Sequence, residues 1–424
     1  MRLRTVACLL LCLCPLVLGG CIGNKMYNPE PAQYLREVED NQNGVPIELA
    51  IIEFDDFGEL WDRAQVNDTV DRITQRNAET EGGIVVAIYV HGWMNNADPD
   101  REENDLFRFR REMGTLSRQL KAIIDSGEKA PERIIAVYIG WRGVTTRFPV
   151  TSKLTFWNRQ RAATRIAAGP MRETLARITD AAREYPKAVV AIQGHSLGGM
   201  IVAKTLEPVL TTLVLNSGQD AVPMGVDMVY LENPALEAIA AKQLIDLLRR
   251  TGARTELRST DGSVRDGGPM VVAITSEADN VTKLAYRAGR VLDNAFRATR
   301  DDHEPGAPSQ WTLVNSAIGH VDYLVSHEAF IEDGQVKLRA IEGAYNTTPF
   351  WVIRCSAEIS ADHGDIHNDR MDELRTVLIE LHDVYDPTTQ PWLTTEGVDS
   401  LLLHEDRDPV TRPGELNKTS GSGS

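Results

Sequence analysis

The stretch Gly194-His195-Ser196-Leu197-Gly198-Gly199 decides how this chain folds. It follows an apolar run over residues 188–192 and opens a second apolar run that is compatible with a helix. This order predicts a strand, a sharp turn at Ser196 and a helix. Such a turn needs small residues two positions away on each side, because a Cβ there would collide with the adjoining strand or helix. Gly194 and Gly198 meet this need, so Ser196 is the predicted nucleophile.

Strand-like runs recur along the chain, with helix-compatible stretches such as residues 159–184 between several of them. The runs cover residues 47–54, 84–90, 134–139, 188–192, 226–231, 270–275 and 350–355. Apolar strands that alternate with helices are typical of an α/β fold, in which helices cover both faces of a mostly parallel sheet. Two intervals, near 232–268 and 281–348, exceed a simple crossover, so we expect lid-like insertions there.

Length and composition are those of a globular chain with a large core. The 424 residues are 42% hydrophobic and 25% charged. The expected organisation is a signal peptide (1–20), a tether (21–45), one α/β domain (46–388) and a C-terminal extension (389–424) with a disordered Gly/Ser-rich end.

The amino terminus has the features of a secretory leader. Two arginines precede an apolar run over residues 6–18, which ends in Leu18-Gly19-Gly20-Cys21. This pattern resembles a bacterial lipoprotein signal, and the resemblance implies that Cys21 becomes the first mature residue and carries lipid. The alternative, an uncleaved membrane anchor, fits less well because the run is short for a spanning helix. The residue after the cysteine is Ile22 and not an aspartate. In this it resembles lipoproteins of the outer membrane that face the periplasm.

Charge and cysteine content narrow the possible partners. The formal net charge is −16, and it becomes −18 once a leader with two arginines and no acidic residue is removed. An acidic chain is a poor partner for nucleic acid or anionic lipid surfaces, so membrane contact is expected through the lipid anchor. Beyond the leader and Cys21, Cys355 is the single remaining cysteine, and its apolar surroundings predict a buried thiol.

The segments Tyr-Val-His-Gly-Trp (residues 89–93) and Gly-His-Ser-Leu-Gly-Gly resemble those of α/β-hydrolase serine esterases and lipases. The resemblance extends from about Ile84 to His382. It implies an oxyanion hole made by two backbone N–H groups, that of Leu197 after the nucleophile and that of Trp93 in an earlier loop. The alternative for residues 91–93 is a strand end with an aromatic side chain packed on the core.

The same resemblance orders a catalytic triad as serine, acid and histidine. Residues 276–280 follow the strand at 270–275, so Asp279 is the expected acid, with Glu277 as the alternative. Either carboxylate could instead cap the helix-like run that follows.

Two histidines compete for the role of the base. His363 lies between the last expected strand and the closing helix, at the carboxyl edge of the sheet, and is preferred. His320 lies in the long insertion, where Gly319-His320 resembles the Gly-His that many hydrolases have at the base position. His327 and His367 are weaker candidates. The Asp and His residues at 362–367 also allow a zinc site, but no His-Glu-x-x-His or paired-cysteine motif accompanies them, so no metal is assigned.

Together these residues predict a membrane-anchored serine hydrolase that cleaves carboxylic esters through an acyl-enzyme intermediate and needs no cofactor. The expected substrate is a small-molecule or lipid-derived ester. Two alternatives stay open: a noncatalytic envelope protein that binds partners on the same fold, and a thioesterase or peptidase that uses the same triad.

Overall fold

The computed structural model describes eleven ranges of the chain: residues 22–38, 43–146, 155–185, 187–217, 222–223, 225–252, 255–258, 264–266, 269–299, 307–341 and 348–384. The predicted leader, Cys21 and the C-terminal extension lie outside these residues.

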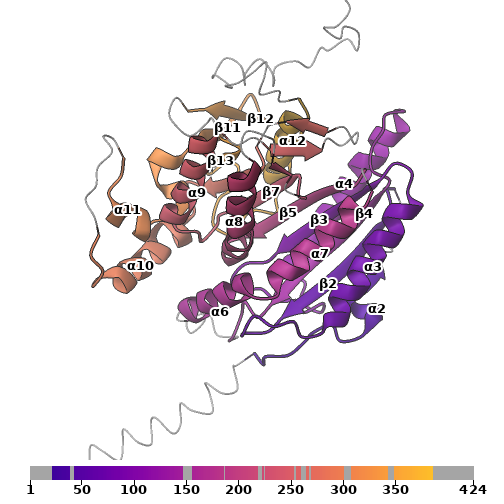
Figure 1. Ribbon diagram of the computed structural model, residues 1–424, viewed down its shortest axis with the longest axis horizontal. Coiled ribbons are helices and arrows are strands. Elements are labelled where there is room, and N and C mark those ends of the chain that lie inside the picture. The colour runs from indigo at the N-terminus through magenta and orange to yellow at the C-terminus, as the bar shows by residue number, and fades with distance from the viewer. Residues whose placement is uncertain are drawn as a thin grey trace, which may run out of the picture.

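A ten-stranded sheet runs through the molecule (Figure 1). In spatial order its strands are β1 (Leu35–Glu37), β2 (Ile47–Phe54), β4 (Arg133–Trp141), β3 (Ile84–Val90), β5 (Val189–His195), β7 (Met228–Glu232), β10 (Val271–Ser276), β13 (Phe350–Cys355), β11 (His327–Glu332) and β12 (Gln335–Ala340). Neighbouring strands are parallel except for β1 against β2 and β12 against β11. The predicted α/β class with a mostly parallel sheet is confirmed.

The seven predicted strands all form. Those at 47–54, 84–90 and 350–355 have the observed bounds, and the ends of the other four differ by one to three residues. The central strands are buried along most of their length, as expected where helices cover both faces of a sheet. Cys355 is buried in β13, as predicted, and burial raises the pKa of its thiol to about 12.

Helices cover the sheet on both faces. One face carries α3 (Arg63–Glu79), α6 (Phe156–Ala168), α7 (Met171–Arg183), α8 (Leu197–Ser217) and α9 (Ala238–Thr251). The other carries α4 (Asp105–Asp125) and α12 (Asp369–Val384), which pack on opposite halves of the sheet. The stretch expected as one helix over 159–184 is two, because Gly169-Pro170 separates α6 from α7.

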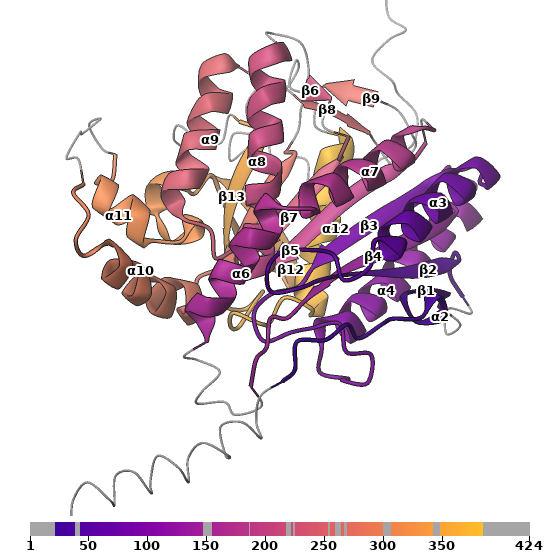
Figure 2. The same cartoon turned by 60° about the horizontal axis from the view of Figure 1, so that its bottom comes forward.

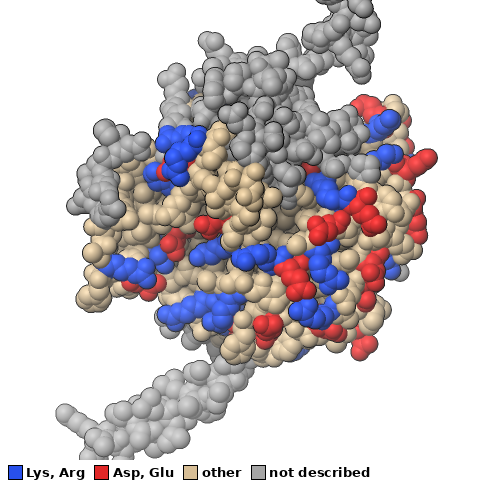
Figure 3. All heavy atoms as spheres, in the orientation of Figure 1, with Lys and Arg blue, Asp and Glu red and all other residues tan. Residues whose placement is uncertain are grey.

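Helix α8 is, among the described residues, the one helix long and apolar enough to cross a membrane. Its apolar window is 56% buried. It packs against α6, α9 and the sheet, so its apolar character is explained by a place in the core. The face that α3, α6 and α7 present to solvent mixes acidic and basic side chains (Figure 3). Ion pairs such as Arg63–Glu173, at 2.9 Å, join neighbouring helices on it.

The two expected insertions are largely parts of the fold. The first supplies α9 as the crossover from β7 to β10, followed by β8 (Thr255–Arg258) and β9 (Val264–Asp266) in a small sheet with β6 (Val222–Pro223). The second begins with a π-helix (Val281–Tyr286), α10 (Arg287–Asn294) and α11 (Gln310–Asn315). Two 3₁₀ turns follow, and the hairpin β11–β12 then extends the sheet beyond β13, so these residues belong to the sheet.

The segment expected as a tether differs most from the prediction. In its described part, α2 (Pro31–Tyr34) and β1 pack on the sheet, and β1 pairs with β2. Upstream, the backbone N–H groups of Tyr27 and Asn28 donate to the buried carboxylate of Glu53 at 2.9 and 2.7 Å. Figure 2 shows this segment approaching the sheet from the side opposite β6, β8 and β9.

Candidate active site

Ser196 stands at the turn between β5 and α8, where the sequence places it. Its φ is 55°, a left-handed value that is uncommon for any residue except glycine. The surrounding backbone holds it there: the Ser196 N–H donates to the carbonyl of Glu232 at 2.9 Å, and its own carbonyl accepts from Ala235 at 3.0 Å. A backbone held in this sparsely populated region is typical of functional sites.

The close approach of this turn to β3 makes glycine necessary at position 198. A Cβ on Gly198 would lie 2.0 Å from the carbonyl oxygen of Val90. We therefore expect Gly198→Ala to lower the free energy of unfolding by about 3 kcal/mol, as overpacking against fixed backbone does. Gly114→Ala is the matched control, because a Cβ there meets only the flexible end of Arg118 at 3.6 Å. It should raise stability by about 0.5–1 kcal/mol in urea unfolding. Equal stability of the two variants would contradict this account of the turn.

Ser196, His363 and Asp279 lie in one continuous row of polar contacts. Ser196 Oγ lies 2.8 Å from His363 Nε2, and His363 Nδ1 lies 2.9 Å from Asp279 Oδ2. His363 comes from the loop between β13 and α12, and Asp279 from the loop after β10. Ser196 and Asp279 are buried, whereas 13% of the His363 side chain is exposed. The carboxylate therefore fixes the imidazole so that its second nitrogen faces the serine hydroxyl.

Asp279 is held as a carboxylate by donors in its own loop. Val281 N–H and Thr282 N–H donate to Oδ1, each at 3.0 Å, and the Thr282 hydroxyl donates to Oδ2. Burial acts to raise the pKa of Asp279, but the hydrogen bonds from His363 and Thr282 outweigh it and the pKa is lowered. Asp279 thus caps the following helical turn, as the alternative considered for it expected, while its other carboxylate oxygen lies beside His363.

The alternative base and acid lie in different surroundings. His320 Nε2 is hydrogen-bonded to the Thr282 hydroxyl at 2.8 Å, and burial lowers its pKa to about 4. Glu277 is exposed, and its carboxylate accepts the N–H of Ala357 at 3.0 Å. His327 is buried with its ring 4.0 Å from that of Trp351. The structure thus brings Ser196 together with His363 and Asp279.

The loop after β3 lies directly against the nucleophile. A Cβ on Gly92 would be 2.9 Å from Ser196 Cβ. His91 ties this loop to the end of β4: its Nδ1 donates to the Gly92 carbonyl and its Nε2 accepts the Trp141 N–H, both at 2.9 Å. Burial lowers the pKa of His91 to about 4, so the neutral ring that makes both bonds is present at pH 7.

The two expected oxyanion donors border this contact. Trp93 follows Gly92, and Leu197 is the first residue of α8, where a helix leaves its N–H without an intrahelical acceptor. The indole of Trp93 packs edge-on against Phe156, with ring centroids 5.2 Å apart, as expected for an aromatic residue on the core. β3 and β5 are adjacent, and successive strands are added on opposite sides of this pair, so the site lies where the strand order reverses.

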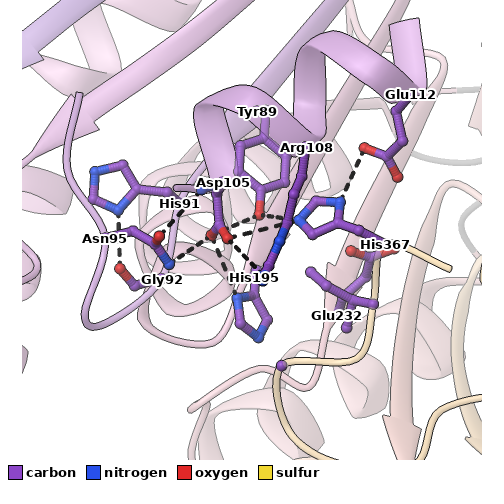
Figure 4. Close-up of polar contacts among 12 residues, drawn as sticks. Tyr89, His91, Gly92, Asn95, Asp105, Arg108, Glu112, His195, Glu232 and His367 are labelled. Carbon is purple, nitrogen blue, oxygen red and sulfur yellow. Dashed lines mark hydrogen bonds and ion pairs between the residues drawn. The ribbon is translucent and has the colours of Figure 1, made fainter. Parts of the chain in front are cut away.

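A buried polar network behind the relay was not predicted from the sequence. His195 Nε2 donates to the backbone carbonyl of His363 at 2.9 Å, and Asn233 Nδ2 donates to the same oxygen at 3.0 Å. His195 Nδ1 lies 3.8 Å from Asp105 Oδ2 (Figure 4). These residues hold the backbone of His363, and the sequence signal for them was weak: His195 belongs to the nucleophile motif, while Asp105 opens a helix.

Asp105 is the centre of this network. Tyr89 and Asn95 donate to its Oδ2 at 3.0 and 2.9 Å, and His367 Nε2 lies 3.8 Å from its Oδ1. His367 in turn lies 3.4 Å from Glu112 (Figure 4). Arg375 of α12 continues the network by pairing with Glu112 and with Glu232.

The zinc alternative for residues 362–367 is not supported by the side chains there. Asp362 accepts the N–H of Gly364 and Asp365 accepts that of Ala361, both at 2.8 Å. His363 and His367 face Ser196 and Glu112, respectively. Within the described parts of the chain, no three potential ligands converge on one point.

Comparisons with known proteins give distant likenesses. No family model and no curated protein matches the chain. Among solved structures it resembles phospholipase PlaB from Legionella pneumophila, at 12% identity and a TM-score of 0.31, over 75% of this chain and 63% of that one. The same phospholipase in complex with thio-NAD matches at 14% identity and a TM-score of 0.24, over 61% and 48% of the two chains. The chain therefore spans between about half and two thirds of the length of these structures.

We expect the network around Asp105 to stabilise the fold in a way that depends on pH. Burial acts to raise the pKa of Asp105, but its contacts with His195 and His367 outweigh burial and hold the pKa far below its usual range. A depressed pKa in the folded state stabilises the fold above the unfolded pKa, near 4, and this contribution is lost as the pH falls towards the folded value. At pH 7, Asp105→Asn should lower the free energy of unfolding by about 3–5 kcal/mol, because it leaves buried histidines without their partner.

Urea unfolding at pH 7 and at pH 3 checks this expectation. The difference in the free energy of unfolding between the wild type and Asp105→Asn should be smaller at pH 3 than at pH 7. Asp125→Asn removes an exposed pair with Lys121 and should change stability by less than about 1 kcal/mol at either pH. A loss of unfolding free energy in Asp105→Asn that is the same at both pH values would contradict the electrostatic explanation.

Proposed function

We propose that this chain is a serine hydrolase of the α/β-hydrolase type that cleaves carboxylic esters. The observation that carries the proposal is the continuous relay from Ser196 Oγ through His363 to Asp279: Ser196 Oγ is hydrogen-bonded to His363 Nε2 at 2.8 Å, and His363 Nδ1 lies 2.9 Å from Asp279 Oδ2. A serine hydroxyl is a weak nucleophile until a positioned base removes its proton, and the relay supplies that base.

In the proposed reaction, Ser196 Oγ attacks the ester carbonyl carbon as its proton passes to His363 Nε2. Asp279 stabilises the imidazolium that forms. The tetrahedral intermediate collapses, the carbonyl–alkoxy bond breaks and the imidazolium gives its proton to the leaving alcohol. Water then attacks the acyl-enzyme with His363 again as base, which releases the carboxylic acid and restores Ser196.

The negative charge on the carbonyl oxygen needs donors, and we assign them to the N–H groups of Trp93 and Leu197. The support is positional: the loop at Gly92 touches Ser196, and Leu197 begins the helix directly after it. Loss of one such donor typically costs about 10²–10³ in kcat.

We also propose that lipid on Cys21 anchors the protein to a membrane of the bacterial envelope. The support is the leader sequence and its end in Leu-Gly-Gly-Cys. The outer membrane, on its periplasmic side, is the proposed location because Ile22 follows the lipidated residue. A lipid-derived ester is the proposed substrate class, because such esters are present in the membrane that holds the anchor.

Hydrolysis of p-nitrophenyl esters of increasing acyl length tests the activity. The wild-type protein should release p-nitrophenol, and Ser196→Ala should fall to the background rate while its urea unfolding curve is unchanged. An acyl thioester and a peptide anilide in the same assay distinguish a thioesterase or peptidase. A folded wild type that cleaves none of the esters would contradict the proposal.

A further inference from the structure

The residue that follows the proposed lipid site is fixed to the body of the protein. The Ile22 N–H donates to the carbonyl of Thr145 at 2.9 Å, and the Ile22 carbonyl accepts from the guanidinium of Arg142. Arg142 is held in turn by an ion pair with Asp56 at 3.0 Å. Both backbone polar groups of Ile22 are therefore bonded to the loop after β4.

That loop packs against the one that touches the nucleophile. A Cβ on Gly143 would lie 2.6 Å from the carbonyl oxygen of Gly92, and the Met94 N–H donates to the Gly143 carbonyl at 3.0 Å. Gly92 lies against Ser196. Two adjoining loops thus separate the start of the mature chain from the nucleophile.

This attachment limits how far the body can move from a lipid on Cys21. Consecutive Cα atoms are about 3.8 Å apart, so a lipid on Cys21 would be attached one residue away from the hydrogen-bonded Ile22. A flexible tether over residues 21–45, as the sequence suggested, would instead have an end-to-end distance of about 25–30 Å. The docked segment orients the site towards the anchor, where a flexible tether would leave it free to turn.

Exposed apolar side chains occur in segments that follow several strands at this edge of the sheet. Phe57 (72% exposed) follows β2, Phe107 (49%) lies in the first turn of α4 after β3, and Leu284 (61%) follows β10. Met94 lies in the loop beside the nucleophile and is 38% exposed. Figure 2 shows α10 and the lower end of α6 on the same side of the molecule as the start of the coloured N-terminal segment. By contrast, the face of α3, α6 and α7 mixes charges of both signs (Figure 3).

We propose that this carboxyl edge of the sheet rests on the bilayer that holds the Cys21 lipid, and that the enzyme cleaves acyl esters of lipids in that same bilayer. The substrate part rests on the proposed esterase activity, whereas the orientation rests on the proposed lipid on Cys21 and needs no catalysis. Apolar side chains at the interface would add to the membrane binding that the lipid provides. The net charge of −18 argues against attraction to anionic headgroups as the source of this binding.

Depth-dependent fluorescence quenching tests the orientation. The full chain with its leader is produced in a bacterial host, purified in detergent and inserted into preformed vesicles of phosphatidylethanolamine and phosphatidylglycerol. Phe57→Cys and Leu284→Cys place a fluorophore at the carboxyl edge, and Ile123→Cys and Leu215→Cys place it at exposed positions near the ends of α4 and α8. Cys355 is buried and should not react in the folded protein.

Lipids with a quencher in the acyl chain should reduce the fluorescence at positions 57 and 284 at least several-fold more than at 123 and 215. Equal quenching at all four positions, stronger quenching at 123 and 215, or a Cys21 that mass spectrometry finds without lipid would overturn the proposal. The comparison requires no catalysis, so it gives the same information in a Ser196→Ala background.

Two vesicle populations test the substrate. Fluorescent acyl lipid is placed either in the vesicles that carry the enzyme or in vesicles added without enzyme. Hydrolysis should be at least about tenfold faster in the first arrangement, because the anchor confines enzyme and substrate to one surface. Equal rates, or turnover of soluble esters with none of vesicle lipid, would overturn the substrate assignment. Failure of every ester would instead refute the proposed function and leave the quenching result standing.

Discussion

His363→Ala is expected to lower kcat/KM for ester hydrolysis by about 10⁴-fold or more, because it removes the group that takes the proton from Ser196. His320→Ala, the competing histidine, should lower it by less than about 10²-fold, the smallest contribution typical of a positioned base. The reason is geometric: His363 Nε2 lies 2.8 Å from Ser196 Oγ, whereas His320 is hydrogen-bonded to Thr282.

Both variants are measured with one soluble ester at pH 7, and urea unfolding establishes that each protein is folded. The pKa of His320 is about 4, so it is neutral at this pH and its removal deletes no charge from the site. A loss for His320→Ala equal to that for His363→Ala would show that the relay does not operate as the geometry indicates.

Asp279→Asn is the second substitution with a large expected effect. An asparagine keeps the shape and an oxygen that can accept from Val281 and Thr282, so the loop should fold. It cannot stabilise an imidazolium, and it permits the wrong tautomer of His363, so kcat should fall by about 10⁴-fold. Because the pKa of Asp279 is lowered, the wild-type carboxylate is ionised across the neutral range.

Glu277→Gln is the matched control in the same loop. Its side chain accepts from Ala357, and a glutamine oxygen can make the same hydrogen bond, so kcat should stay within about threefold of the wild type. A comparable loss in both variants would mean that the loop, and not the Asp279 carboxylate, is what matters.

The strands and the turn at Ser196 were predictable because their signals are local. A parallel strand that is buried on both faces is a continuous apolar run, and β2, β3 and β13 were delimited on that basis. The position of His363 followed from chain order, since a residue after the last strand must lie at the carboxyl edge of the sheet.

Other features depend on contacts between distant segments, which leave no periodic pattern. The residues of β11 alternate between buried and partly buried, so the hairpin at the sheet edge lacks a continuous apolar run. The N-terminal segment is polar, and it is held by backbone bonds to Glu53 and by pairing with β2. The network around Asp105 requires α4, β5 and α12 to meet, which only the fold determines.

Labelling with a fluorophosphonate, followed by mass-spectrometric mapping of the modified residue, tests the central claim most directly. The account predicts that the folded wild-type protein takes up one phosphonyl group on Ser196, and that His363→Ala loses this reaction while His320→Ala retains it. An unmodified wild type, or a label that remains on another residue in Ser196→Ala, would contradict the account.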